Sequence, residues 1–497
     1  MPAVSTPSRR TSGTSPVIRV LLMLGVPMIG ALTVLGTWLH NEIIVTAGWL
    51  AVSVVGFLLV RPVIGIAVMT GGFLLAAYPT PLQALGVLTI NNLLGLCFLA
   101  LLAFRVVETR DWSFLEIKQI RILLLIGMLL LIGTFVSAWT FPLLVESRGS
   151  FKIGAILDKS ATLGHNFVAR LVFLVFFCVF VRTRADIKVV FMTFMLALFA
   201  AVPSALSNLL TGNLARGFRA AASVTSGSNP NRLAMICLME MACWWFWAHA
   251  RRGVARQLVA LAAMGMAVTV CMATGSRSGL LGIGVLGLVL QTGPKAFRVP
   301  AMHLGLFVAA GAIAIATLVP DESWNRMTNF SPERGEIGAT SNRMREETLE
   351  RAWEVSLDYP LFGVGLGNFR EVSRQVYKDA FYRPPHNSYL WASSEGGIVV
   401  VAAYLWLFWV TWKDLQIIRT LTAGRDQELL AFAHAIRGVF LLYFFFSSVA
   451  DLWLHPITYC LLGLVITMRR YVEELAASEA AVVASPAGSP ALRRAAA

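Results

Sequence analysis

Charged residues are scarce in this chain. Asp, Glu, Lys and Arg make up 14% of its 497 residues, whereas apolar residues make up 57%. A soluble domain usually contains about 25% charged and 45–50% apolar residues. The composition therefore excludes an ordinary soluble protein and predicts an integral membrane protein, with the lipid bilayer as its surroundings.

The chain also lacks the residue patterns of a disulfide framework or a metal site. Its six cysteines all lie within apolar runs, without CxxC or metal-ligand spacing. We interpret them as small buried hydrophobic residues. The loops that we expect outside the membrane contain no paired-Asp motif. We therefore predict that the protein uses neither a metal nor another cofactor.

Basic residues exceed acidic residues and lie mostly in short loops between the apolar runs. The formal net charge of +14 could indicate a nucleic-acid partner, but position matters more than the total, because basic short loops orient a membrane protein. We expect no nucleic-acid partner. By the positive-inside rule both termini are cytoplasmic, as are the loops that contain Arg105, Arg110, Lys118, Arg121, Arg182, Arg184, Lys188, Arg251, Arg252, Arg256, Lys295, Arg298, Lys413 and Arg419.

Fourteen apolar runs are candidates for membrane spans. A span needs about 20 apolar residues, and the hydrocarbon leaves only helices as its backbone structure here. We predict an all-α polytopic membrane protein with about 14 transmembrane helices (12–14) and one larger periplasmic loop containing short helices. The runs are 18–39, 43–60, 63–78, 85–104, 121–141, 165–181, 187–210, 233–250, 256–273, 279–291, 301–319, 389–412, 432–450 and 452–468.

The runs divide the chain into five expected parts. Residues 1–17 form a cytoplasmic tail, and residues 18–319 form a transmembrane bundle of about eleven helices. Residues 320–388 form the periplasmic loop, because a long loop is not bound by the positive-inside rule. Residues 389–468 add about three transmembrane helices, and residues 469–497 form a cytoplasmic tail expected to be disordered.

Two short segments stand out in the periplasmic loop. Asn342–Leu357 has helical periodicity, with Leu349, Trp353 and Leu357 at four-residue steps. The segment LFGVGLGNF, residues 361–369, contains three alternate glycines. Its spacing is not that of a dinucleotide-binding loop, so we interpret these glycines as structural, allowing tight turns and close backbone approach.

Arginines remain in the loops that we expect outside the membrane. A lone outward arginine is commonly a solvated charge or an interfacial anchor. Several of them on one side, mostly in Gly/Ser surroundings, favour a phosphate-binding site, because the planar guanidinium group suits phosphate. These arginines are Arg216, Arg219, Arg232 and Arg277.

The segment YRPPHNSYLW, residues 382–391, leads from the periplasmic loop into an apolar run. His386 has two interpretations. It either makes a local hydrogen bond while Asn387 caps the following helix, or it is a general base for a substrate held in the membrane.

Other titratable residues lie in or beside the apolar runs. Carboxylates inside a membrane span are rare and usually functional or paired, which applies to Glu240 and Glu395. Asp451 and His455 lie at another outer edge, where they are either partners of each other or simple polar connections between helices.

Four motifs in this order resemble the bacterial O-antigen ligase and polymerase superfamily. They are R-G-F-R…S-N-P-N-R (216–232), T-G-S-R-S-G (274–279), D-Y-P-L-F-G-V-G-L-G-N-F (358–369) and H-N-S-Y-L…E-G-G (386–397). The resemblance covers roughly residues 210–400, together with the many-span layout. Such enzymes act on glycans attached to undecaprenyl diphosphate, at the outer side of the inner membrane.

The resemblance implies metal-independent, inverting glycosyl transfer at the periplasmic face of the inner membrane. His386 would deprotonate an acceptor hydroxyl, while Arg277, with Arg216 or Arg219, would hold the diphosphate. The implied partners are an undecaprenyl-diphosphate-linked glycan donor, a glycan or lipid-core acceptor and possible polysaccharide-assembly proteins. Supporting residues would be Asn387, Glu395 and Arg345.

The spacing of the motifs leaves polymerase and ligase both open. The polymerase pattern of Arg, ten residues and Gly is met by Arg216 and Gly227, whereas Arg351 and Gly363 are one residue too far apart. The ligase pattern is met in part around Arg345. We favour a polymerase over an O-antigen ligase. The alternative from another class is a membrane transporter of an anion or small solute, although transporters typically show internal repeats and no clear repeat is visible here.

Overall fold

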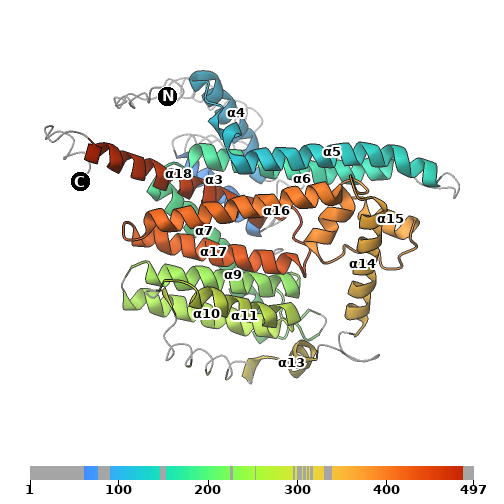
Figure 1. Cartoon of the computed structure of the whole chain (residues 1–497). Coiled ribbons are helices and arrows are strands. Elements are labelled where there is room, and N and C mark those ends of the chain that lie inside the picture. The colour runs from blue at the N-terminus through green and yellow to red at the C-terminus, as the bar shows by residue number, and fades with distance from the viewer. Residues whose placement is uncertain are drawn as a thin grey trace, which may run out of the picture.

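The described part of the chain is almost entirely helical (Figure 1). No β-strand occurs in it, and a single isolated bridge joins Ala215 to Arg219. The expected all-α class is therefore confirmed. The computed structural model describes residues 61–75, 90–145, 153–215, 217–223, 228–251, 253–294, 297–298, 305, 309, 313, 317–329 and 339–484.

The helices follow one another through short connections in most of the chain. In order they are α3 (Pro62–Leu75), α4 (Ile90–Thr109), the 3-10 helix η2 (Ser113–Glu116), α5 (Lys118–Val145), α6 (Ile153–Phe180), α7 (Arg184–Phe199), α8 (Ala201–Leu210), α9 (Pro230–His249), α10 (Val254–Ala273), α11 (Arg277–Gln291), α13 (Asp321–Thr328), α14 (Ala339–Asp358), α15 (Phe369–Gln375), α16 (Ser388–Thr422), α17 (Gln427–Ser447) and α18 (Pro456–Ala484).

Six of the described helical segments are long and apolar enough to cross a membrane, so the expected count of about 14 is not supported. They are Lys118–Trp139, Ser160–Phe180, Arg184–Leu210, Val254–Ala273, Ser388–Thr422 and Gln427–Ser447. The described part of the run 63–78 forms the short apolar helix α3, and the run 279–291 forms the short apolar helix α11. The runs 18–39 and 43–60 lie outside the described residues, as does most of 301–319.

Helix α9 lies at the centre of one half of the bundle, where it packs against α7, α10, α11 and α17. Helix α16 joins this half to the other by packing against α5, α17 and α18. Figure 1 shows α5 and α6 side by side along one edge, with α16, α17 and α9 following in successive rows. The rings of Phe191 on α7 and Phe432 on α17 stack with their centroids 4.2 Å apart. Apolar and aromatic side chains thus fill the space between the helices.

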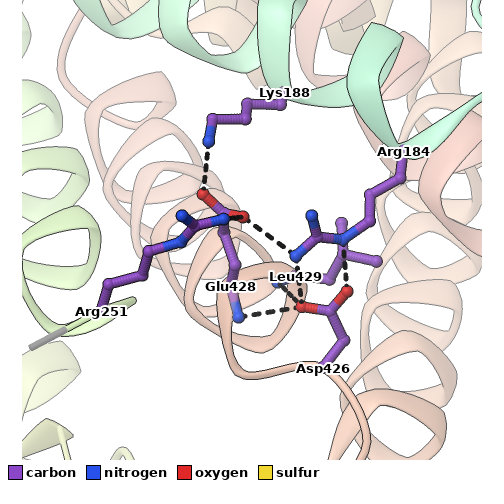
Figure 2. Close-up of polar contacts among 6 residues, drawn as sticks. All are labelled: Arg184, Lys188, Arg251, Asp426, Glu428 and Leu429. Carbon is purple, nitrogen blue, oxygen red and sulfur yellow. Dashed lines mark hydrogen bonds and ion pairs between the residues drawn. The ribbon is translucent and has the colours of Figure 1, made fainter.

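A cluster of ion pairs ties three helix ends together at one end of the bundle (Figure 2). The Glu428 carboxylate on α17 receives Arg184 at 2.9 Å, Lys188 at 2.8 Å and Arg251 at 3.0 Å. All three basic residues belong to loops that we predict on the same side of the membrane. The structure brings these loops together at one end.

Asp426 completes this cluster and starts α17. Its carboxylate accepts two hydrogen bonds from Arg184, at 2.6 and 3.0 Å, and caps the helix by accepting from the N–H groups of Glu428 and Leu429 (Figure 2). Burial by itself would raise the pKa of Asp426, but the hydrogen bonds and the positive charge of Arg184 outweigh burial and lower the pKa. The carboxylate is therefore held in its charged form.

The glycine-rich segment 358–369 packs against a kink in α16. Gly397 interrupts the helix with φ 75° and ψ 179°, and a Cβ atom there would lie 2.2 Å from the Leu361 carbonyl oxygen. The freed N–H of Ile398 donates to the Pro360 carbonyl at 2.8 Å. A Cβ at Gly363 would clash with the backbone of Glu395. These close approaches support the structural interpretation of the glycines.

The helix predicted within residues 320–388 is confirmed as α14, but its buried face differs from the apolar pattern. Trp353 and Leu357 are 57% and 62% exposed. The buried residues are Thr348, Ala352 and Val355, of which the last two pack with Val364, Phe369 and Val372. The helix docks on α15 and α16 through small side chains.

The segment expected to be a disordered tail begins as a helix. Helix α18 continues to Ala484, so the disorder predicted for 469–497 is wrong for its first part. Arg469 pairs with Glu473 four residues later and also contacts Asp414 on α16. Such pairs support a helix, and alanine has the highest helix propensity. Residues 485–497 lie outside the described residues.

Candidate functional site

His386 occupies a fixed position at the start of α16. Its backbone has φ 52°, a left-handed conformation that is uncommon for a residue other than glycine. Asn387 caps the helix, because its side-chain oxygen accepts hydrogen bonds from the N–H groups of Tyr389 and Leu390, each at 3.0 Å. The capping role of Asn387 is therefore confirmed.

Asp451 is the partner of His386. The Nδ1 atom of His386 lies 2.7 Å from the Asp451 carboxylate, and the two side chains are 26% and 17% exposed. Ser388 fixes the loop that carries Asp451, since its hydroxyl donates to the Ala450 carbonyl at 2.8 Å and accepts from the Leu452 N–H at 2.9 Å. A carboxylate on Nδ1 orients the ring and leaves Nε2 as the proton acceptor.

His386 borders a cavity of about 110 Å³. Its wall is formed by the turn around Ala215 and Arg219, the start of α9, the first turns of α14 and the segment before α16. Three arginine side chains share this wall with the imidazole. The lining residues are Ala215, Arg219, Asn229, Pro230, Asn231, Ser341, Met344, Arg345, Arg383 and His386.

Arg219 is only 3% exposed and connects two of the sequence motifs. Its Nε donates to the Thr274 carbonyl at 2.6 Å, and its Nη2 donates to the Asn231 side chain at 2.8 Å. The neighbouring Ala220 N–H donates to the Ala273 carbonyl at 2.9 Å. Arg219 therefore holds the start of α9 against the end of α10 while it lines the cavity. Arg216, the alternative candidate, lies outside the described residues.

Arg277 does not line this cavity. Its Nε donates to the Arg326 carbonyl at 2.9 Å, and its Nη1 contacts the Asn342 side chain. The remaining nitrogen, Nη2, is buried and has no hydrogen-bond partner among the described residues. Since Asn342 follows the cavity residue Ser341, Arg277 lies beside the wall and joins α11 to α13 and α14. Its role in diphosphate binding stays a prediction.

The two other supporting candidates differ in position. Arg345 lines the cavity from α14. Glu395 is 1% exposed and lies further along α16, beside the backbone of Gly367 and Phe369. It does not line the cavity. The structure thus separates Glu395 from the surroundings of His386 and places it against the glycine-rich segment.

Sequence reasoning missed three residues of this region. Arg383 lines the cavity three residues before His386, and its guanidinium group has no hydrogen-bond or ion-pair partner in the described part of the chain. Asn231 binds Arg219 from the S-N-P-N-R motif. Arg170 on α6 donates to the Leu454 carbonyl, next to the loop of Asp451. Arg170 could have been found, because a charged residue within an apolar run is rare.

This arrangement can hold an anion next to a proton acceptor. Guanidinium groups bind phosphate oxygens through charge-assisted hydrogen bonds, and an imidazole with one nitrogen fixed by a carboxylate can take a proton at the other. Within the described ranges, no three His, Cys, Asp or Glu side chains gather as a metal site. The side chains that line the cavity are thus suited to holding an anion beside an imidazole that can accept a proton.

Comparison with known proteins agrees with the motifs. Residues 262–405 match the family described as O-antigen ligase. The match begins in α10 and ends in α16, so it includes Arg277, Arg345, Arg383 and His386, whereas Arg219 and Asp451 lie outside it. No curated protein matches the chain. Over residues 262–405 the chain is therefore similar to the O-antigen ligase family, in agreement with the resemblance of its motifs to the O-antigen ligase and polymerase superfamily.

Proposed function

We propose that the protein is an inner-membrane glycosyltransferase that joins an undecaprenyl-diphosphate-linked oligosaccharide to a glycan acceptor, in O-antigen or exopolysaccharide assembly. One observation carries this proposal. His386, paired with Asp451 at 2.7 Å, borders a cavity whose wall also contains Arg219, Arg345 and Arg383. Half of the residues that line this wall, including Arg345, Arg383 and His386, belong to the segment that matches the O-antigen ligase family.

The proposed reaction begins when His386 Nε2 removes the proton from an acceptor hydroxyl. The acceptor oxygen attacks the anomeric carbon of the donor sugar and forms the new glycosidic bond, with inversion. The bond between this carbon and the diphosphate oxygen breaks, and the lipid diphosphate leaves with the bonding electron pair. Asp451 stabilises the imidazolium that forms, as the buried carboxylate does in other His–Asp pairs.

The arginines have a separate task in this proposal. Charge builds up on the diphosphate as it leaves, and preorganised cationic donors stabilise such charge strongly. Arg219, Arg345 and Arg383 line the cavity directly. Arg277, and Arg216 as the alternative to Arg219, remain proposed diphosphate ligands on the basis of the resemblance. Asn387 supports the site by starting α16.

The position of the cavity suits a substrate with a lipid tail. His386 lies two residues before Ser388, where a membrane-compatible helix begins. The tail of the donor is confined to the hydrocarbon, so the diphosphate and the first sugar lie at headgroup depth. The end of a membrane span is at the same depth. We propose that this end of the bundle faces the periplasm, because the opposite end carries the basic loops.

The experiment uses purified protein in lipid nanodiscs with a defined lipid-linked donor and acceptor. His386→Ala should lower the rate of transfer by about 10²–10⁴-fold, the usual contribution of a general base, and His386→Gln should be nearly as poor. The control is His165→Gln, an exposed histidine outside the cavity. If the His386→Gln protein keeps more than about a third of wild-type turnover, the base is another group, since general base catalysis normally contributes far more.

The acceptor decides between polymerase and ligase. We favour a polymerase, which extends a growing chain, over a ligase, which transfers the chain to a lipid core. A strain that lacks a polymerase retains single repeats on its acceptor, whereas a strain that lacks a ligase attaches none. The glycan profile of a deletion strain, complemented with wild-type or His386→Ala protein, distinguishes the two. If glycan transfer is unchanged in the deletion strain, the proposed function is wrong and the transporter alternative is favoured.

A further inference from the structure

A second polar cavity lies at the other end of the bundle, where α4, η2, α6 and α18 meet. Its volume is about 180 Å³, and three arginines line it: Arg105 from α4, Arg182 directly after α6, and Arg470 from α18. Arg184, two residues after Arg182, belongs to the ion-pair cluster at the start of α17. Since α16 runs from the His386 site to that start, the two cavities lie at opposite ends of the bundle.

Two of the arginines that line this cavity, Arg182 and Arg470, are held mainly by backbone carbonyls. Arg182 Nε donates to the Val179 carbonyl at 2.9 Å, and Arg470 donates to the Cys178 carbonyl at 2.5 Å and also to the Val181 carbonyl. Glu474 lies 3.9 Å from Arg470 Nε, but its side chain is 63% exposed. Backbone carbonyls orient these guanidinium groups without cancelling their full charge.

One carboxylate faces the arginines. Asp111 lines the cavity and accepts a hydrogen bond from the Ser113 N–H at 2.9 Å. Hydrogen bonds from Ser113, followed by the positive charges of Arg182 and Arg105, lower the pKa of Asp111, so this residue is ionised. Among the residues that line the cavity, three arginines thus accompany one carboxylate. Guanidinium groups are suited to binding phosphate oxygens.

The cavity lies at the depth of lipid headgroups. Its wall includes Cys178 and Val179, near the end of the span Ser160–Phe180, and Ile117, which precedes the span Lys118–Trp139. Directly after its lining residues Val106 and Asp111 in the chain come two exposed apolar side chains, Val107 at 79% and Trp112 at 57%. Tryptophan is enriched where hydrocarbon meets headgroups. The apolar surroundings point to lipid as the neighbour of this cavity.

We propose that this cavity binds the phosphate group of an anionic glycerophospholipid, with Arg105, Arg182 and Arg470 as its ligands. The acyl chains lie along the exposed apolar side chains of α4 and η2. Basic pockets between membrane helices on the cytoplasmic side are suited to such headgroups. The site is independent of glycosyl transfer and does not rest on the proposed function.

Native mass spectrometry of the purified protein in detergent tests the proposal, with phosphatidylglycerol and phosphatidylcholine as competing lipids. The wild-type protein should retain one phosphatidylglycerol in preference to phosphatidylcholine. Arg105→Gln combined with Arg182→Gln should weaken this retention at least about tenfold, because hydrogen bonds to charged groups are the strong ones. The control is Arg110→Gln, which removes an exposed arginine close to Arg105 that does not line the cavity.

A single variant, Arg182→Lys, tests the proposal even if the double variant does not fold. It keeps the charge but removes the planar fork, so an intermediate loss of retention is expected. Glycerol phosphate and inorganic phosphate provide the other arm of the experiment. If either displaces phosphatidylglycerol at equal concentration, the ligand is a soluble anion and the lipid proposal is overturned. Equal retention of both lipids, or equal retention by wild-type and Arg182→Lys proteins, would also overturn it.

Discussion

Replacement of Asp451 by asparagine removes the negative charge beside His386 while keeping the size of the side chain. The His386 Nδ1 atom lies 2.7 Å from the carboxylate in a site where the two side chains are 26% and 17% exposed. An amide oxygen in the same position can still accept the Nδ1–H hydrogen bond. The variant therefore tests the charge itself, which stabilises the imidazolium formed when His386 takes a proton.

The size of the expected decrease in kcat follows from the contact between His386 and Asp451. A hydrogen bond to a charged group contributes about 1.5–3 kcal/mol, and a tenfold change in rate corresponds to about 1.4 kcal/mol. The kcat of Asp451→Asn should thus fall about 10- to 150-fold. The KM for the lipid-linked donor should change little, because Asp451 does not line the cavity.

The assay is transfer of labelled sugar by purified protein in nanodiscs, with kcat and KM determined separately. Asp321→Asn is the control, because this acidic residue is exposed in the first turn of α13 and contacts neither His386 nor the cavity. If Asp451→Asn keeps more than half of the wild-type kcat, the charge of Asp451 does not stabilise the His386 imidazolium, and the carboxylate only holds the loop in place. A large increase in KM with unchanged kcat would assign Asp451 to substrate binding instead.

Further predictions concern binding, stability and orientation. Arg383→Gln should raise the KM for the lipid-linked donor about tenfold or more, because it removes a charged ligand from the cavity wall; an unchanged KM would place the diphosphate elsewhere. Arg277→Lys should lose most of its activity while its amount in the membrane stays normal, because lysine cannot reach both Arg277 partners with one planar group. The pKa of Asp426 is lowered below 3.8, so its contribution to the free energy of unfolding is present at neutral pH and is lost as the pH falls through the lowered value. The midpoint temperature of thermal unfolding should therefore fall less between pH 5 and pH 3 for Asp426→Asn than for wild type. A cysteine at exposed Glu350 should react with an impermeant thiol reagent in spheroplasts while one at Arg425 should not, and the reverse pattern would invert the proposed orientation.

Local patterns in the sequence determined the class of the protein and many of its helices. The period of apolar residues and the length of apolar runs depend only on neighbours in the chain, which is why α5, α16 and α17 lie close to the predicted spans. The helix cap at Asn387 could be predicted for the same reason. The helix α14 was also predicted, although its large apolar residues Trp353 and Leu357 are exposed.

The predicted number of about 14 spans is not confirmed in the described part of the chain, and hydropathy alone does not tell whether a helix crosses a membrane or fills the interior. The run 279–291 illustrates this, since its helix α11 has only 15 residues and packs against both α9 and α17. The glycines of α11 allow this contact: a Cβ at Gly282 would lie 2.6 Å from the Leu238 side chain. Close packing of this kind depends on the partner helix, which the local pattern does not contain.

By itself, the sequence determined an all-helical membrane protein, the presence of His386 before a span, and the arginines in the loops around it. Only the tertiary structure decided that His386 pairs with Asp451, that Arg219 reaches Thr274 and Asn231, and that Glu395 lies away from the cavity. These contacts join residues that are far apart in the chain, and they exist because α9, α10, α16 and α17 pack together. A side chain acquires its partner from the packing of its helix, so no pattern within a single segment could assign it.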